Sequence, residues 1–209
     1  MFDFLDITSL LYRAPALLIA LTLHEYAHAF VSDRLGDPTP SMEGRLTVNP
    51  LAHLDPVGTV MLVLCGFGWA KPVEIDPRYY VDYKSGVIKV SFAGPGMNLL
   101  ICFIAVLLMT AGIHFRLLQQ SGYMFLYWIM LYNVWFAFFN LIPVPPLDGS
   151  KILEMILPGE LAWNFHNISY RYGFIILMLL VFSGMVNRFI GPLANSYVEI
   201  CSMIGKMIF

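Results

Sequence analysis

Long apolar runs recur along this chain of 209 residues and are separated by short polar segments. Crossing a hydrocarbon layer of about 30 Å takes roughly 20 helical residues. On this basis the sequence predicts membrane-crossing helices over residues 7–31, 90–113, 123–142, 172–186 and, as the weakest of the five, 190–208. We therefore expect an all-α, multi-span membrane protein with about five or six transmembrane helices.

The segment between the first two expected spans has a different pattern. Residues 36–56 are polar and rich in Pro and Gly, and residues 44–49 alternate polar and apolar side chains as a short strand would. Residues 57–69 are apolar but too short and too rich in glycine to cross, which favours a re-entrant or interfacial segment. Residues 71–76 are typical of another short extended piece. We expect a small membrane-associated β element here, within one integral-membrane domain over residues 1–209.

The composition agrees with a membrane environment. Hydrophobic residues make up 58% of the chain and charged residues 12%, whereas about a quarter of the residues in a soluble domain are charged. The formal net charge is -2 and no run is rich in Lys and Arg. The chain therefore lacks the electrostatic footprint of a nucleic-acid-binding protein, and we expect membrane lipid around it and no nucleic-acid partner.

Basic residues in the short loops predict the orientation, because Lys and Arg concentrate in cytoplasmic loops. The segment between the second and third expected spans carries Arg116 alone. The segment between the first and second spans carries six basic residues, namely Arg34, Arg45, Lys71, Arg78, Lys84 and Lys89. We expect a multi-pass protein of the cell membrane whose first loop is cytoplasmic, and counting spans places the loop over residues 143–149 on the same side.

The end of the first span carries the sequence His24-Glu25-Tyr26-Ala27-His28. Residues four apart lie on one face of a helix, so the two imidazoles can bind the same ion, with Glu25 held beside it. A zinc ion with three protein ligands lowers the pKa of a bound water from 15.7 to about 7, and a neighbouring carboxylate can take its proton. Chance could also produce this spacing, but ionisable groups within a membrane helix are costly and are usually kept for a function. The pattern indicates a hydrolytic zinc site with Glu25 as the catalytic base.

Asp148 is the strongest candidate for a third ligand. It follows the third expected span, on the membrane face where the first span also ends, and lies in a segment with three prolines before Gly149. The prolines restrict the backbone and the glycine permits a sharp turn. An aspartate here could instead cap the helix that starts near Ser150, and the residues alone leave both roles open.

Four motifs in this order resemble the site-2 protease family of intramembrane zinc metalloproteases. They are the HExxH sequence at residues 24–28, the GRLTVNP sequence at residues 44–50, the FAGPGMN sequence at residues 92–98, and the NxxPxPxxDG pattern at residues 140–149. The resemblance extends from the first span to about residue 155. The chain resembles a minimal core of this family, without PDZ or CBS domains.

The resemblance implies roles for individual residues. His24, His28 and Asp148 would bind one zinc ion, and Glu25 would act as the general base and then as the acid for the departing amine. Asn98 and Asn140 would lie near the zinc and hold the substrate or the oxyanion. The substrates would be transmembrane segments of other proteins, cut in regulated intramembrane proteolysis, and the basic-residue count places the active site toward the cytoplasmic side.

Other expectations come from the residues themselves. His53 could gate or line the site, or could pair with Asp55 at the interface. A transmembrane substrate must unwind before its peptide bonds are accessible, and we hypothesise that residues 44–48 and 71–75 offer a strand edge to the unwound segment.

Two rival functions have other chemistry. A membrane metal-ion transporter would explain buried ligands without hydrolysis, although it would not need Glu25. A proteolytically inactive scaffold would bind membrane helices, although it would not need Glu25 or the complete ligand set.

Overall fold

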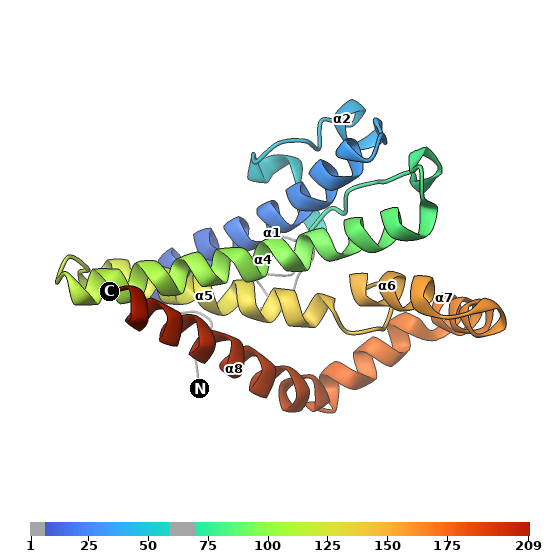
Figure 1. Cartoon of the computed structure of the whole chain (residues 1–209). Coiled ribbons are helices and arrows are strands. Elements are labelled where there is room, and N and C mark those ends of the chain that lie inside the picture. The colour runs from blue at the N-terminus through green and yellow to red at the C-terminus, as the bar shows by residue number, and fades with distance from the viewer. Residues whose placement is uncertain (1–6, 59–69) are drawn as a thin grey trace.

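A computed structural model describes residues 7–58 and 70–209, and Figure 1 shows that most of this part of the chain is helical. The elements are α1 (Ile7–Arg34), α2 (Thr39–Met42), η1 (Pro50–Ala52), η2 (Pro77–Tyr79), α4 (Tyr83–His114), α5 (Gln120–Asn140), α6 (Asp148–Ile156), α7 (Gly159–Phe182) and α8 (Met185–Ile208). This confirms the expected all-α architecture.

Three long helices, α1, α4 and α5, lie side by side and make the most extensive contacts in the fold (Figure 1). Small side chains such as Ala16 and Ala105 are buried between them beside the larger Trp128 and Ile129. Small residues let membrane helices approach closely, which matters because lipid provides no hydrophobic drive for helix association. These helices form the framework of the site.

The last two helices, α7 and α8, match the fourth and fifth predicted spans only in part. Within the described residues, four helices are long and apolar enough to cross a membrane: α1 over Ser9–Arg34, α4, α5 and α7. The fourth predicted span corresponds to the second half of α7, whose first half is more polar. The fifth corresponds to α8, which is helical but falls outside these four. One face of α8 packs on α4 and α5 through Ile190, Ala194 and Cys201.

The prediction of a small β element is wrong for the residues that the structure describes. Residues 44–48 form a turn and loop, and residues 71–76 run without a strand partner. The one β-type pairing there is an isolated antiparallel bridge between Leu54 and Ala70. Most of the expected re-entrant segment lies outside the described residues.

The burial of Arg45 explains the error. Its guanidinium, 3% exposed, donates to the backbone carbonyls of Ala52 and Lys71, while Val48 is 60% exposed. Apolar side chains therefore face outward here and the arginine faces inward, the reverse of a half-buried strand. A side chain, and not a neighbouring strand, satisfies these carbonyls.

Candidate metal centre

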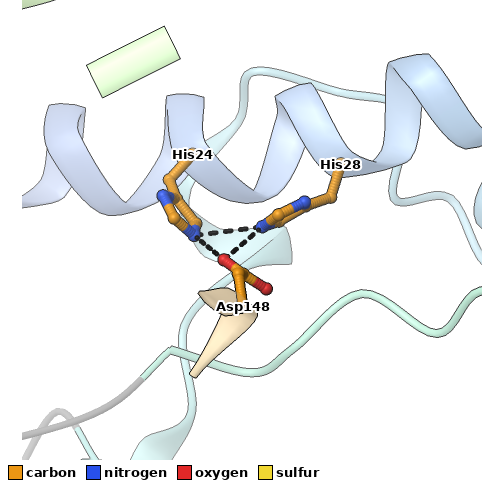
Figure 2. Close-up of side chains that lie close together, drawn as sticks. All are labelled: His24, His28 and Asp148. Atoms are coloured by element: carbon orange, nitrogen blue, oxygen red, sulfur yellow. Dashed lines mark hydrogen bonds and ion pairs between the residues drawn. The ribbon is translucent and has the colours of Figure 1, made fainter. Parts of the chain in front are cut away.

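His24 and His28 lie one turn apart on α1 and point away from its axis toward the same point (Figure 2). Both side chains are buried, and their Nε2 atoms are 3.0 Å apart. The predicted one-face arrangement of the two imidazoles is therefore present.

Asp148 approaches the two imidazoles from the first turn of α6, opposite α1 (Figure 2). Its Oδ2 lies 3.3 Å from Nε2 of His24 and 3.2 Å from Nε2 of His28. Leu147 occupies the N-cap of α6, so the helix is not capped by Asp148 as the alternative interpretation proposed.

The local chain explains how Asp148 reaches this position. A Cβ on Gly149 would fall 2.2 Å from the backbone oxygen of Leu141, so only glycine lets the start of α6 fold back against the end of α5. The short connection from Leu141 to Leu147 therefore places the carboxylate beside α1.

The three atoms form a triangle that fits a metal ion. Each of the three residues offers one ligand atom, and these atoms lie within 4.8 Å of one another. Donors at about 2.0–2.2 Å from a tetrahedral zinc lie roughly 3.3 Å apart, which agrees with the 3.0, 3.2 and 3.3 Å separations. Two imidazoles and one carboxylate are also a donor set typical of catalytic zinc, which leaves a fourth position open.

The far side of each imidazole is fixed by α4. Nδ1 of His24 lies 2.6 Å from the side-chain oxygen of Asn98, and Nδ1 of His28 lies 2.7 Å from the backbone oxygen of Val90. A carbonyl oxygen can only accept, so each Nδ1 donates its proton and each Nε2 keeps a lone pair for a metal. Both rings are thus held in the tautomer that binds zinc through Nε2.

Gly94 lets α4 come this close. A Cβ at this position would lie 2.5 Å from Nε2 of His28 and 2.7 Å from Nε2 of His24. Only a residue without a side chain therefore fits here between α4 and the two histidines. Gly96 does not share this role, because a Cβ there would meet only Phe92 of the same helix, at 3.4 Å.

Glu25 faces the same cavity as the three proposed ligands. The cavity has a volume of about 120 Å³ and is lined by His24, Glu25, His28, Pro72, Val73, Ile75, Val90, Ser91, Asn140, Pro146, Asp148 and Lys151. One carboxylate oxygen of Glu25 accepts a hydrogen bond of 3.0 Å from the backbone N–H of Val73. The segment over residues 72–75 therefore runs beside the carboxylate.

Comparison with known proteins supports the chemistry of this site. Residues 111–180 match the family model of Peptidase family M50. YwhC of Bacillus subtilis (strain 168), named as a candidate zinc metalloprotease, is 36% identical over 191 residues, which cover 88% of this chain and 86% of YwhC. The chain belongs to peptidase family M50, the site-2 protease family. This M50 peptidase is a zinc metalloprotease, and zinc is its cofactor.

Further relatives of the M50 peptidase carry similar names. Rip2 of Mycolicibacterium smegmatis, again named as a candidate zinc metalloprotease, is 31% identical over 200 residues, which cover 91% of this chain and 74% of Rip2. The zinc metalloprotease MJ0392 of Methanocaldococcus jannaschii is 24% identical over 172 residues, or 82% of this chain and 42% of MJ0392. No solved structure gives a significant match.

The two predicted asparagines of this M50 peptidase occupy different positions. Asn140 lines the cavity, and its Nδ2 donates to the backbone oxygen of Phe136. Asn98 is fully buried behind His24, outside the cavity lining, and its Nδ2 donates to Ala20 O and to Oδ1 of Asn133. This placement favours an orienting role for Asn98, whereas contact of either asparagine with the substrate or oxyanion stays a prediction.

His53 lies apart from this cavity. It is 1% exposed, and its Nε2 is 2.8 Å from the backbone oxygen of Thr47, so it holds the loop that Arg45 also fixes. The contact does not involve the cavity, and the gating role stays a prediction.

Sequence reasoning missed Ser91 and Asn133 as residues of the site. A lone asparagine in the middle of an apolar span was a usable signal for Asn133, because an amide in a membrane helix needs a partner. Ser91 gave no such signal, since serines are common at membrane-helix contacts.

Proposed function

We propose that this M50 peptidase is an intramembrane endopeptidase that hydrolyses peptide bonds within or near transmembrane segments of other membrane proteins. The observation that carries the proposal is that the triangle of His24, His28 and Asp148 shares one cavity with Glu25. Two of these ligands and Glu25 lie on α1, a helix of membrane-spanning length.

Each residue has a distinct part in the reaction. His24, His28 and Asp148 hold zinc, which when bound supplies a Lewis acid that lowers the pKa of water to about 7. Glu25 takes a proton from the attacking water and later gives it to the departing amine. The N–H of Val73 bonds to one carboxylate oxygen of Glu25, and the proton transfer is assigned to the other oxygen.

The substrate must present an unwound segment, because helical carbonyls are already hydrogen-bonded. Pro72, Val73 and Ile75 line the cavity, and the main chain of this segment would pair with the unwound substrate. Arg45 anchors one end of this backbone at Lys71, and Asp37 anchors the other by accepting from the N–H of Asp76 at 2.8 Å. Residues 44–48 do not line the cavity. Of the two segments expected to bind the unwound substrate, only residues 71–75 therefore remain candidates.

We further propose that the site lies toward the cytoplasmic side of a multi-pass protein of the cell membrane. Support comes from the six basic residues between the first two spans, since such loops stay cytoplasmic. Membrane lipid surrounds the single domain over residues 1–209.

The test compares wild type with Glu25→Gln in detergent, measuring bound zinc and cleavage of a model transmembrane substrate. The expected result is about one zinc per chain in both proteins and cleavage by the wild type alone. A metal-ion transporter would instead move zinc into sealed vesicles with or without the Glu25 carboxylate. Zinc binding by both proteins, without cleavage of any of several substrates, would reject the protease proposal.

A further inference from the structure

The side chain of Ser91 is buried beside the cavity, and its hydroxyl has no protein partner among the described residues. Its side chain is 1% exposed and lines the same cavity as Glu25 and the three proposed zinc ligands. Among the described residues, its Oγ has no hydrogen-bond partner. A buried polar group without a partner is unfavourable, so such a group calls for a functional explanation.

This behaviour is unusual for a hydroxyl on a helix. Serine and threonine in helices commonly donate back to a carbonyl three or four residues earlier. Thr110 on the same helix does so to Val106 O at 2.9 Å, and Ser150 on α6 does so to Leu147 O at 2.6 Å. Ser91 lacks this bond, so its O–H has no partner in the protein and can bond to a substrate only when the cavity is occupied.

Ser91 lies on the face of α4 that packs against the two histidines. Ser91, Gly94 and Asn98 are spaced by three and four residues and thus share one helix face. Gly94 packs against both imidazoles and Asn98 bonds to His24. Val90, next to Ser91, accepts from His28. Ser91 therefore lies at the His28 end of this face, where α4 borders the cavity.

We propose that Ser91 is a further catalytic residue, whose hydroxyl donates a hydrogen bond to the oxygen of the scissile carbonyl. The inference rests on the proposed protease function. As the oxygen of water bonds to the carbonyl carbon, Glu25 takes the proton and the electron pair of the C=O bond moves to its oxygen. The O–H of Ser91 stays intact and stabilises that developing charge.

Two substitutions at Ser91 distinguish the effect of losing the hydroxyl group from the effect of changing the side chain. Ser91→Ala removes the donor, and Ser91→Thr keeps it. Thr110→Val is the matched control, because it removes a hydroxyl from the same helix that is already bonded within the helix. Zinc content and the absorption spectrum of the cobalt-substituted proteins report whether the metal site is intact.

The expected result for Ser91→Ala is a fall in kcat on the order of 100-fold, with KM, zinc content and the cobalt spectrum unchanged. Ser91→Thr should keep most of the wild-type kcat, and Thr110→Val all of it. A phosphinic pseudopeptide of the substrate sequence mimics the tetrahedral state, so its Kd should rise for Ser91→Ala by the factor lost in kcat/KM.

Several outcomes would overturn the inference. They are an unchanged kcat for Ser91→Ala, equal losses for Ala and Thr, a change in KM alone, and a loss that follows the zinc content. If the wild type cuts and Glu25→Gln does not, any of these rejects Ser91 while the protease function stands. If the wild type cuts no substrate, both proposals fall together.

Discussion

The side-chain oxygen of Asn98 lies 2.6 Å from Nδ1 of His24, and this contact joins α4 to α1 directly behind the proposed zinc ligand. The amide orientation is fixed, because Nδ2 of Asn98 donates to Ala20 O at 3.0 Å and to Oδ1 of Asn133 at 2.7 Å. Asn133 in turn donates to Ile129 O. A chain of buried amides from α5 through α4 thus sets the tautomer of His24.

Removing the amide of Asn98 should therefore weaken zinc binding. Loss of a partner behind a metal-bound histidine typically lowers metal affinity about 10–100-fold, and we expect this for Asn98→Leu. Asn133→Leu should have a smaller effect, because Asn98 then keeps its bond to Ala20. Competition with a zinc chelator measures both affinities. Wild-type zinc affinity in Asn98→Leu would contradict the orienting role.

Gly94 and Gly96 offer a matched pair of substitutions on one helix. Gly94→Ala should displace the imidazoles, because its Cβ would lie 2.5 Å from Nε2 of His28. We expect it to lose bound zinc and cleavage together. Gly96→Ala meets only Phe92 at 3.4 Å, and alanine favours a helix by about 1 kcal/mol over glycine, so this variant should keep zinc and activity. Equal zinc contents in the two variants would refute this account of Gly94.

The sequence was sufficient for features that depend on local spacing. The apolar runs predicted the long helices, and the spacing of His24 and His28 predicted two imidazoles on one face. Asp148 was harder, since 120 residues separate it from His28 and the residues alone allowed a capping role. Its position depends on the close contact of Gly149 with Leu141, which is a tertiary feature.

Features that depend on long-range burial were misjudged or missed. The alternation over residues 44–49 indicated a strand only if its apolar side chains were buried, whereas Arg45 is the buried residue. The partner of Asn98 on α5 and the position of Ser91 beside the cavity depend on how α1, α4 and α5 pack. One sequence contains no direct record of such contacts.

Arg45 should be essential for holding the segment beside Glu25. Hydrogen bonds to charged groups contribute roughly 1.5–3 kcal/mol each, so Arg45→Met should lower the free energy of unfolding by about 3 kcal/mol or more. Its loss frees the carbonyl of Lys71, two residues before Val73, so we expect reduced kcat/KM with zinc retained.

Arg78→Met is the control for this substitution. Its guanidinium is largely exposed and pairs with Asp76 two residues away, and exposed pairs contribute little. We expect near wild-type stability and activity. Thermal unfolding and cleavage assays on both variants make the comparison, and equal behaviour of the two would count against an anchoring role for Arg45.

Asp37 should make the stability of this region depend on pH. Its carboxylate is fully buried and accepts from Ser32 Oγ at 2.7 Å, Thr39 N at 2.9 Å and Asp76 N at 2.8 Å. Burial alone would raise the pKa of Asp37, but these hydrogen bonds outweigh it and hold the pKa below its ordinary value of 3.8. A carboxyl with a lower pKa when folded than when unfolded stabilises the fold above 3.8, and this contribution fades as the pH falls toward the folded value.

Asp37→Asn should therefore be destabilised most where the wild-type carboxylate is ionised. An amide offers one acceptor oxygen in place of two, so at about pH 7 we expect a loss of roughly 1–3 kcal/mol. Below about pH 3.8 the difference in stability from the wild type should narrow, because the unfolded wild-type carboxyl takes up a proton there while the folded carboxyl, with its lower pKa, still resists it. Thermal unfolding across this pH range measures the difference in stability between Asp37→Asn and the wild type. Glu43→Gln, at an exposed position, is the control. A difference in stability that stays constant with pH would mean that the charge of Asp37 does not anchor the segment beside the active site, and that only the size and shape of its side chain matter.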